Sequence, residues 1–553
     1  MAAPPPLHGS SPRRRHRSLA ILAVGALACG AAAFGALEAR PSARPAGAAA
    51  PPTTIPAAGA ELPSWFTDAK LGIFIHWGVY SVPAWAPVGS YAEWYWLFSS
   101  LPIFPQYQHH LDTYGPEVRY DDFIPQFTAE RWDPTDWIDL IGASGAKYWV
   151  FTTKHHDGFE LWPSSSTDRN SVELGPKRDL VGDLMEANEG SGLKAGLYYS
   201  IPEWFNPAPV PARYSDMYDG LNEIFETFDH PFDPYEPDAP PLPYTGYKPI
   251  SDYATGQVIP DVTELVDRYH PSILWCDIGG DPDYFQSQRL IDHFKADGAT
   301  AHPEGVVVNN RCGLPGDYDT PEYQPVPDAP ARYFEATRGL GSSFGFNRNE
   351  QLDDYLTDDQ VIRTLIDTVA AGGNLLLDIG PEADGTIPQV MRDRLLALGA
   401  WLDVNGDAIY ATEPGPATGS CTQRSTISRD GTVNIIELGR PADELRIEPD
   451  ITLGPDARVT LLGGDGAPLD TRVADGRLVV SLPEGAPDGS SSAYVLRITD
   501  ATAAVRVGTS APDCDPEPTP TTTPATPGTP PTAGGPATPG AARPVAGRPT
   551  YAG

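Results

Sequence analysis

The chain has 553 residues, a formal net charge of −35 and a pI of about 4.5. This length accommodates at least two domains of ordinary size. The excess of acidic residues argues against nucleic acid or an anionic membrane surface as a partner, because both require clustered Lys and Arg. The 12 Trp and 24 Tyr residues suit a packed core and also the binding of carbohydrate.

Residues 1–58 have the pattern of a secretory signal followed by a Pro/Ala linker. The basic stretch PRRRHRS precedes the apolar run LAILAVGALACGAAAFGAL, and small residues follow. This order predicts export with removal of the signal, and therefore a secreted, extracellular protein. An uncleaved membrane anchor is the alternative, because ~19 apolar residues can also span a bilayer.

Residues 59–412 alternate apolar strand patterns with helical patterns. The strand candidates are 71–77, 147–156, 194–200, 272–277, 305–311, 331–336 and 373–381. Repeated alternation of strand and helix implies a parallel sheet. Seven candidates over this length predict an α/β fold of the TIM type, a (β/α)8-like barrel with one irregular or missed strand. A doubly wound open sheet is the alternative.

The pattern changes after the predicted barrel. Residues 413–511 contain short strand patterns such as TVNIIEL and RVTLLG between Gly, Pro and Asp turns, and they predict a C-terminal antiparallel β-sandwich. Residues 512–553 are rich in Pro and Thr and contain almost no large apolar residue, so we expect a disordered tail.

Four cysteines follow the signal, and export would place them in an oxidising compartment. Cys421 and Cys514 lie near the two ends of the predicted sandwich, so we expect a disulfide between them. Cys276 and Cys312 each adjoin a candidate site residue, and we expect both to be small buried thiols.

Polar residues stand at or near the carboxyl ends of the predicted strands, where barrel enzymes carry their catalytic groups. They are His76, His155, His156, Asp277, Arg311 and Glu335. A strand end has no general need for such residues, and together they predict an active site at the mouth of the barrel. The alternative is that Asp277 has no catalytic role and only opens the turn before Gly279.

Aromatic residues lie one layer below two of these groups. Side chains alternate along a strand, so Phe74 shares a face with His76, and Trp275 shares a face with Asp277. Polar groups above an apolar floor suit a sugar that carries one hydrophobic patch.

The pair His155–His156 could instead belong to a metal site. Neighbours on a regular strand face opposite ways, however, so both cannot bind one metal unless the strand has ended, and no second His pair has the spacing of metal ligands. We therefore predict no metal and no other cofactor.

Several longer motifs occur in order between about residue 63 and residue 412. They are KLGIFIHWGVYSVPAWAP, GSYAEWYW, TTKHHDGFELWPS, GPKRDLVGDLMEA, GLYYSIPEWFNP, LWCD and AAGGNLLLDIGPEADGTIP. Together they resemble the α-L-fucosidases of glycoside hydrolase family 29. The resemblance implies a retaining hydrolase that releases terminal α-L-fucose from fucosylated glycans through a covalent fucosyl-enzyme.

The resemblance also implies roles for individual residues. Asp277 matches the family's nucleophile, and Glu335 matches its acid/base, with Phe334 where the family usually has Trp. The sugar-binding residues of the family match His76, Glu93, Trp94, His155, His156 and Arg311, and its methyl-facing aromatics match Phe74 and Trp275. Glu322 and Asp319 are the reserve candidates for the acid/base. A secreted fucose-binding lectin and a different retaining glycosidase on the same barrel are the alternative functions.

Overall fold

The computed structural model describes residues 62–204, 245–324, 330–416, 420–439, 443–447, 451–483 and 492–503. The predicted signal, the Pro/Thr-rich tail and Cys514 lie outside these described residues. Within the described part of the chain, no helix combines the length and the apolar character needed to cross a bilayer.

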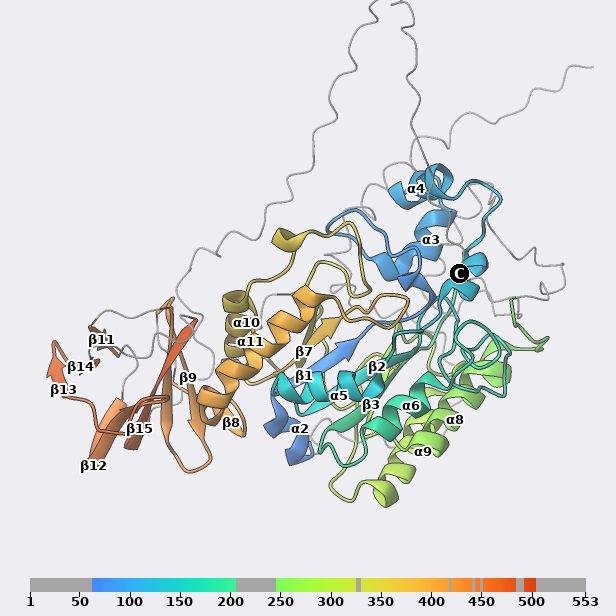
Figure 1. Ribbon diagram of the computed structural model, residues 1–553. Coiled ribbons are helices and arrows are strands. Elements are labelled where there is room, and N and C mark those ends of the chain that lie inside the picture. The colour runs from blue at the N-terminus through green and yellow to red at the C-terminus, as the bar shows by residue number, and fades with distance from the viewer. Residues whose placement is uncertain are drawn as a thin grey trace, which may run out of the picture. The chain divides into compact units, whose positions relative to one another are not determined.

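Seven parallel strands form one sheet with the order β5-β4-β3-β2-β1-β7-β6. Figure 1 labels its middle strands β3, β2, β1 and β7. The strands are β1 Leu71–Ile75, β2 Tyr148–Lys154, β3 Lys194–Ser200, β4 Ile273–Asp277, β5 Val307–Val308, β6 Glu335–Gly339 and β7 Asn374–Ile379. Five of the seven predicted strands have nearly these bounds. The exceptions are β5, which keeps only two residues of the predicted 305–311, and β6, which begins at Glu335 and not at residue 331.

An irregular segment, residues 317–323, connects the two edge strands β5 and β6. Its parallel bridges join Asn309 to Tyr318, Asp319 to Phe334 and Glu322 to Thr337. This segment occupies the position of an eighth strand. The predicted (β/α)8-like barrel with one irregular or missed strand is thereby confirmed.

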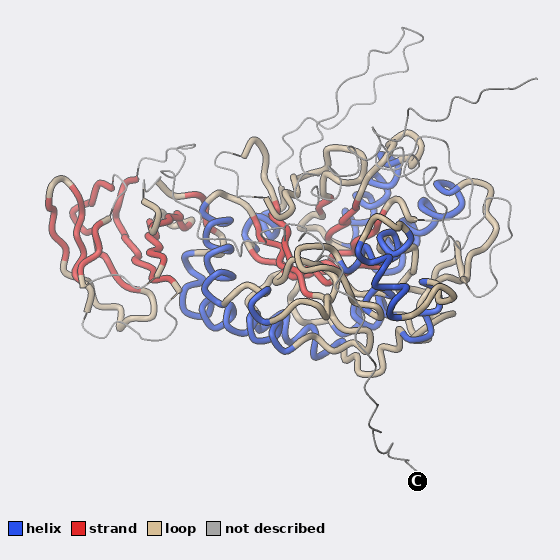
Figure 2. Tube along the Cα trace, turned by 90° about the horizontal axis from the view of Figure 1, so that it is seen from above, coloured by secondary structure: helices blue, strands red, loops and turns tan. Residues whose placement is uncertain are grey.

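Helices surround the strands of the parallel sheet (Figure 2). The α-helices are α2 Ser64–Ala69, α3 Tyr95–Ser100, α4 Pro105–Thr113, α5 Pro134–Ala143, α6 Leu180–Ala187, α8 Ile259–Tyr269, α9 Ser287–Ala301, α10 Asp358–Ala370 and α11 Gln389–Asn405. The shorter helical turns are η3 Val79–Ser81, η4 Ala92–Trp94, η5 Tyr120–Gln126, η6 Ala254–Val258, η7 Leu352–Asp354 and η8 Gly406–Ala408. Thr357 caps α10, with Oγ1 accepting the Gln360 N–H at 3.3 Å.

The two faces of the barrel strands build two different cores. The inward face carries an aromatic-rich cluster that includes Phe74, Tyr148, Tyr198 and Trp275, all buried. The outward face packs its aliphatic side chains against the surrounding helices. The inner cluster forms the floor beneath the mouth of the barrel.

Two antiparallel sheets follow, with the orders β12-β15-β10-β9-β8 and β11-β14-β13. The strands are β8 Thr412–Pro414, β9 Gln423–Ser428, β10 Val433–Leu438, β11 Glu444–Arg446, β12 Ile451–Leu461, β13 Thr471–Ala474, β14 Arg477–Ser481 and β15 Ala493–Ala503. Side chains of both sheets, among them Ile435, Val480 and Leu496, share one buried cluster. The predicted β-sandwich is confirmed.

Candidate active site

Asp277, the last residue of β4, has a hydrogen-bonded carboxylate whose side chain is 13% exposed. Arg311 Nη1 donates to Oδ1 at 3.0 Å, and the Tyr198 hydroxyl donates to Oδ2 at 2.8 Å. The Ile278 backbone N–H also donates to Oδ1, at 2.9 Å. His156 Nε2 lies 3.6 Å from Oδ2. These groups fix the carboxylate at the mouth of the barrel. A residue that served only the turn would need the local bond from Ile278 but not the contacts with Arg311, Tyr198 and His156.

Glu322 lies beside Asp277, because Arg311 Nη1 also donates to Glu322 Oε2, at 2.8 Å. The two carboxylate oxygens bound by this nitrogen are therefore no more than about 5.8 Å apart. Tyr91 donates its hydroxyl to Glu322 Oε1 at 2.9 Å. Thr320 holds the arginine itself, by accepting from Nε at 2.8 Å and from Nη2 at 3.0 Å.

Glu335, the residue that the resemblance matches to the acid/base, lies inside the barrel below this pair. It is 0% exposed, and its two oxygens accept hydrogen bonds from the Tyr148 hydroxyl at 2.7 Å and from Trp275 Nε1 at 2.9 Å. Burial raises the pKa of its carboxyl to about 7.

The strand boundary explains why Glu335 is not at the mouth. It is the first residue of β6, whereas the predicted strand 331–336 placed it near a carboxyl end. Its partner Trp275 stands two residues, or about 6.6 Å of strand, before Asp277. Glu335 thus makes its contacts one layer below Asp277, whereas Glu322 shares the Arg311 nitrogen with Asp277. Asp319, the other reserve candidate, pairs with Arg332 at 2.8 Å.

Three buried histidines line the mouth. His76 follows β1, with Nδ1 2.6 Å from Asp378 Oδ1, and His156 Nδ1 lies 2.5 Å from Ser200 Oγ. The rings of His155 and His76 are 5.6 Å apart between centroids. Burial lowers the pKa of all three imidazoles. They are therefore neutral at neutral pH, and each offers one donor and one acceptor.

His155 and His156 lie side by side, with ring centroids 4.2 Å apart. Opposite orientation was expected only while the strand continued, and β2 ends at Lys154, so alternation stops before this pair. No group of three His, Cys, Asp or Glu side chains suited to a metal ion occurs within the described ranges. Metal independence remains a prediction.

Glu93 and Trp94 come from the turn η4, above the histidines. Glu93 Oε2 accepts hydrogen bonds from Ser343 Oγ and the Gly345 N–H, both at 2.9 Å, and burial raises the pKa of its carboxyl to about 7. Glu93 Oε1 and His155 Nδ1 are buried and have no hydrogen-bond partner among the described residues. The Trp94 ring lies 5.6 Å from that of His156.

Apolar rings complete the site. Phe74 and Trp275 lie 5.0 Å apart between centroids, and the Arg311 guanidinium carbon is 5.0 Å from the centre of the Trp275 ring. Phe344 stacks on His76 at 4.9 Å. The predicted polar site residues other than Glu335 are thus gathered at the mouth, above a floor that includes Phe74 and Trp275.

Sequence reasoning did not assign Tyr198 or Phe344. Tyr198 could have been found from alternation, since it stands two residues before the end of β3. Phe344 lies in a loop after β6, and no periodic pattern marks it.

The cysteines differ from the expectation. Cys276 and Cys312 form a disulfide and are not free thiols, because the ends of β4 and of the segment after β5 bring their Cα atoms to 5.0 Å. Cys421 is disulfide-bonded. Its predicted partner Cys514 lies outside the described residues, so that pairing stays a prediction.

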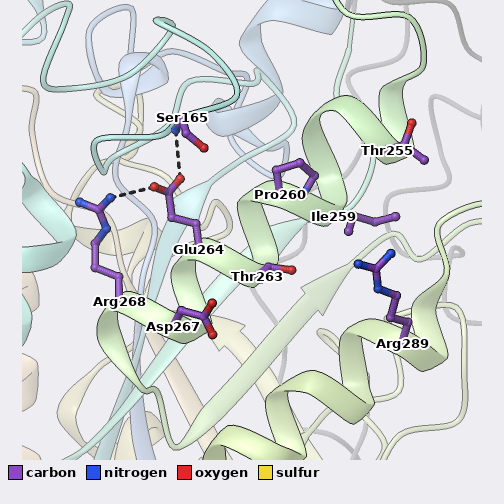
Figure 3. Close-up of a pocket in the computed structure, with 9 residues that line it drawn as sticks. All are labelled: Ser165, Thr255, Ile259, Pro260, Thr263, Glu264, Asp267, Arg268 and Arg289. Atoms are coloured by element: carbon purple, nitrogen blue, oxygen red, sulfur yellow. Dashed lines mark hydrogen bonds and ion pairs between the residues drawn. The ribbon is translucent and has the colours of Figure 1, made fainter.

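A surface pocket of about 620 Å³ lies elsewhere, on the outer face of α8 (Figure 3). Its acid Glu264 accepts from the Ser165 N–H at 3.0 Å and from Arg268 Nη2 at 2.8 Å. Arg289 of α9 lines the opposite side. These groups lie among outer helices, away from the strand ends, and do not form part of the site.

Known proteins share this architecture. The model of the family described as alpha-L-fucosidase matches residues 42–407, about two thirds of the chain. The chain belongs to the α-L-fucosidase family. It is 34% identical to the human tissue alpha-L-fucosidase over 79% of this chain and 89% of that protein. It is 33% identical to the alpha-L-fucosidase of Dictyostelium discoideum, over 79% of this chain and 93% of that protein.

Solved structures of the family agree with the fold. The alpha-fucosidase of Thermotoga maritima in complex with fucose matches with a TM-score of 0.64 at 38% identity, over 79% of this chain and 97% of that one. Family membership makes this chain a glycoside hydrolase that acts on fucose, and the lectin alternative is not supported.

Proposed function

We propose that the protein is a secreted, retaining α-L-fucosidase in which Asp277 is the nucleophile and Glu322 the acid/base. The observation that carries the proposal is the shared Arg311 nitrogen, which keeps one oxygen of Asp277 and one of Glu322 within about 5.8 Å. Retaining glycosidases need two carboxyl groups ~5–5.5 Å apart, whereas inverting enzymes need room for a water molecule.

The first half of the reaction forms a glycosyl ester. An Asp277 oxygen attacks the anomeric carbon of fucose while the bond to the leaving oxygen breaks, and Glu322 gives that oxygen its proton. Tyr198 and Arg311 hold Asp277 in place for this attack. Glu322 suits its role better than Glu335, because its side chain is 27% exposed and Glu335 is closed off.

The second half releases the sugar. Water attacks the anomeric carbon, its proton passes to Glu322, and the ester bond to Asp277 breaks. Two inversions at the same carbon retain the α configuration, and the enzyme returns to its starting state.

The rest of the site suits a 6-deoxy sugar. Glu93 Oε1 and His155 Nδ1 are buried and lack a partner among the described residues, so sugar hydroxyls would satisfy them. Phe74 and Trp275 offer apolar contact for the methyl group. A fucose-bound relative of the same family supports this assignment. The substrate would therefore be a glycan that ends in α-L-fucose.

Secretion is proposed from the N-terminal sequence, in which a basic stretch precedes an apolar run. Amino-terminal sequencing of the enzyme from the culture medium tests it. A chain that begins after the apolar run supports export and cleavage, whereas an intact terminus in the membrane fraction would contradict it.

Replacing the nucleophile tests the mechanism. Asp277→Gly should lower kcat by at least ~10³, and added azide should restore part of the turnover and give a fucosyl azide of inverted, β configuration. Near-normal turnover without azide would overturn the proposal and return Asp277 to the role of a turn residue.

A further inference from the structure

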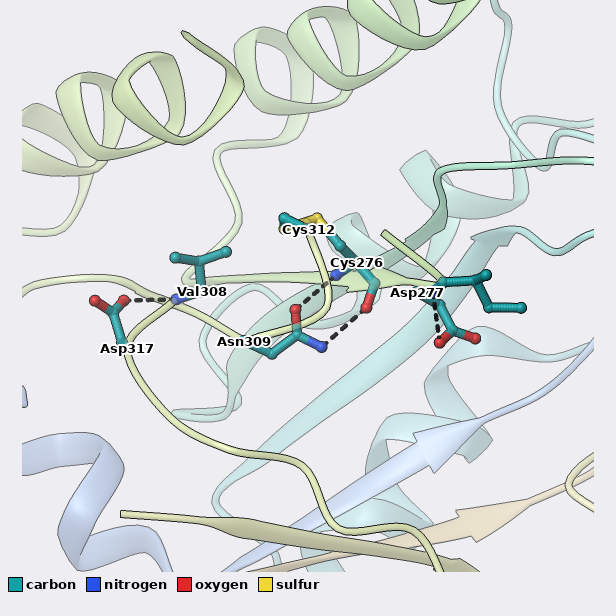
Figure 4. Close-up of a disulfide and its surroundings, with 7 residues drawn as sticks. Cys276, Asp277, Val308, Asn309, Cys312 and Asp317 are labelled. Carbon is teal, nitrogen blue, oxygen red and sulfur yellow. Dashed lines mark hydrogen bonds between the residues drawn. A yellow bond between two sulfur atoms is a disulfide. The ribbon is translucent and has the colours of Figure 1, made fainter. Parts of the chain in front are cut away.

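The Cys276–Cys312 disulfide joins the two chain segments that carry the paired charges of the active site (Figure 4). Cys276 immediately precedes Asp277, and Cys312 immediately follows Arg311. Each half-cystine is therefore the chain neighbour of one partner in the Arg311–Asp277 ion pair, which measures 3.0 Å.

Backbone pairing between β4 and β5 ends before it reaches these residues. The last pair in register is Leu274 with Val308, three residues short of Asp277. Beyond this pair, the side chain of Asn309 takes the hydrogen bonds of the β4 backbone that a neighbouring strand would otherwise make. Its Oδ1 accepts the Cys276 N–H at 3.0 Å, and its Nδ2 donates to the Cys276 carbonyl at 2.9 Å. The disulfide therefore links the two segments after the backbone hydrogen bonds between β4 and β5 have ended.

The disulfide lies behind the wall of the barrel. Trp275 and Asp277 face the interior, so Cys276 between them faces outward, and Figure 4 shows its side chain pointing away from that of Asp277. Both cysteines are 2% exposed and pack in the outer core. The disulfide therefore does not touch the site directly, and it can act there only through the backbone.

The backbone after Asp277 needs such support. Ile278 has a φ of 45°, which is unfavourable for a β-branched residue. At Gly279 an added Cβ would come within 2.3 Å of Gly313 N, so the two loops touch. Strained conformations persist only where the surrounding structure fixes them. A covalent link immediately before Asp277 provides this constraint.

We propose that the Cys276–Cys312 disulfide is a positioning element for catalysis, which keeps the Asp277 carboxylate within reach of Arg311. The inference rests on the proposed role of Asp277 as nucleophile. Because Asp277 acts in the chemical step, loosening it should lower kcat. Binding of the sugar by His76 and Glu93 should be left unchanged.

The test is the double variant Cys276→Val with Cys312→Ala, in which Val fills part of the space left by the sulfur. With an aryl α-L-fucoside, kcat should fall about tenfold or more, because a small misplacement of a reacting group is costly. The inhibition constant of L-fucose should stay within about twofold. The control Cys421→Ala removes a disulfide-bonded cysteine of the sandwich and should lower thermal stability without changing kcat.

A folded double variant whose kcat is within twofold of the parent would overturn the proposal, and so would an equal loss of kcat and of fucose binding. If the variant does not fold, the parent is treated with increasing thiol reductant, and opening of this disulfide is counted by alkylation and peptide mass spectrometry. Activity should fall as the disulfide opens, while circular dichroism stays native. Activity that persists, or that falls only on unfolding, would overturn the proposal. Turnover by Asp277→Gly would instead refute the proposed function.

Discussion

Asp277 and Glu322 are bound by one and the same nitrogen, Arg311 Nη1, at 3.0 and 2.8 Å. They come from different parts of the barrel, since Asp277 ends β4 and Glu322 lies in the irregular segment between β5 and β6. The arginine balances two carboxylates that would otherwise repel each other. It also limits the separation of the two bound oxygens to about 5.8 Å, which suits the double displacement that we propose.

The loss of activity in Glu322→Gln should be larger for substrates with poorer leaving groups. A general acid matters most where the leaving group departs poorly unaided, so hydrolysis of natural fucosides should fall by at least ~10². Formation of the fucosyl-enzyme from a fucoside with an acidic phenol should fall far less. A panel of aryl and glycan fucosides measures this dependence, with Glu335→Gln as the matched control. Should Glu335→Gln show the dependence and Glu322→Gln lack it, the two roles are exchanged.

Arg311→Lys keeps the positive charge and removes the planar group. Lys cannot bond Asp277, Glu322 and Thr320 together from fixed directions, so we expect kcat/KM to fall by ~10–100-fold despite the conserved charge. Steady-state kinetics checks this loss. A Lys variant with parental kcat/KM would show that charge alone suffices.

Glu93→Gln tests the sugar pocket. The buried Glu93 Oε1 has no partner within the described ranges, and an amide nitrogen in its place can no longer accept a hydroxyl proton. We expect the inhibition constant of L-fucose to rise by ~10-fold or more. Unchanged inhibition by fucose would remove Glu93 from the binding site.

Glu335 predicts a pH dependence of stability. Its pKa is raised from 4.5 to about 7 in the folded protein, so the folded state holds more protons than the unfolded state between these values. The contribution of Glu335 to stability therefore falls as the pH rises from 4.5 to about 7, by about 3 kcal/mol in total. Above pH 7 the contribution is flat.

Glu335→Gln removes this titration. Between pH 5 and pH 8 the parent should lose free energy of unfolding relative to the variant, because only the parent carries the Glu335 carboxyl. Denaturant unfolding of both proteins at each pH measures this change. A difference that stays constant over this range would show that Glu335 does not carry a raised pKa.

The sequence predicts those site residues that follow an apolar run. His76, His155 and Asp277 each stand at or just after the end of such a run, and the structure gathers all three at the mouth. The signal is strong because a strand buried on both faces is apolar throughout, and its first polar residue then marks the strand end.

The sequence does not predict strands whose pairing depends on their neighbours. The segment DYDTPEY at 317–323 has no apolar run, and its bridges are set by β5 and β6. The strand β6 is EATRG at 335–339, whereas the sequence pattern predicts a strand at 331–336, most of which precedes β6. As a result, Glu322 lies at the mouth of the barrel, where the sequence pattern places Glu335, and Glu335 lies at the start of β6. Tertiary pairing overrides local preference in both of these segments.

The disulfide was also not predictable. The separation of 36 residues between Cys276 and Cys312 carries no signal of proximity. Proximity follows only once β4 and β5 are placed as neighbours in the sheet.

Trapping the covalent intermediate tests the central claim most directly. A 2-deoxy-2-fluoro-α-L-fucosyl fluoride slows both steps but leaves a good leaving group, so the fucosyl-enzyme should accumulate. We predict that peptide mass spectrometry will find the added fluorofucosyl group on Asp277, in a peptide that the Glu322→Gln variant labels as well. A label on another residue, or inactivation without any covalent adduct, would contradict Asp277 as the nucleophile.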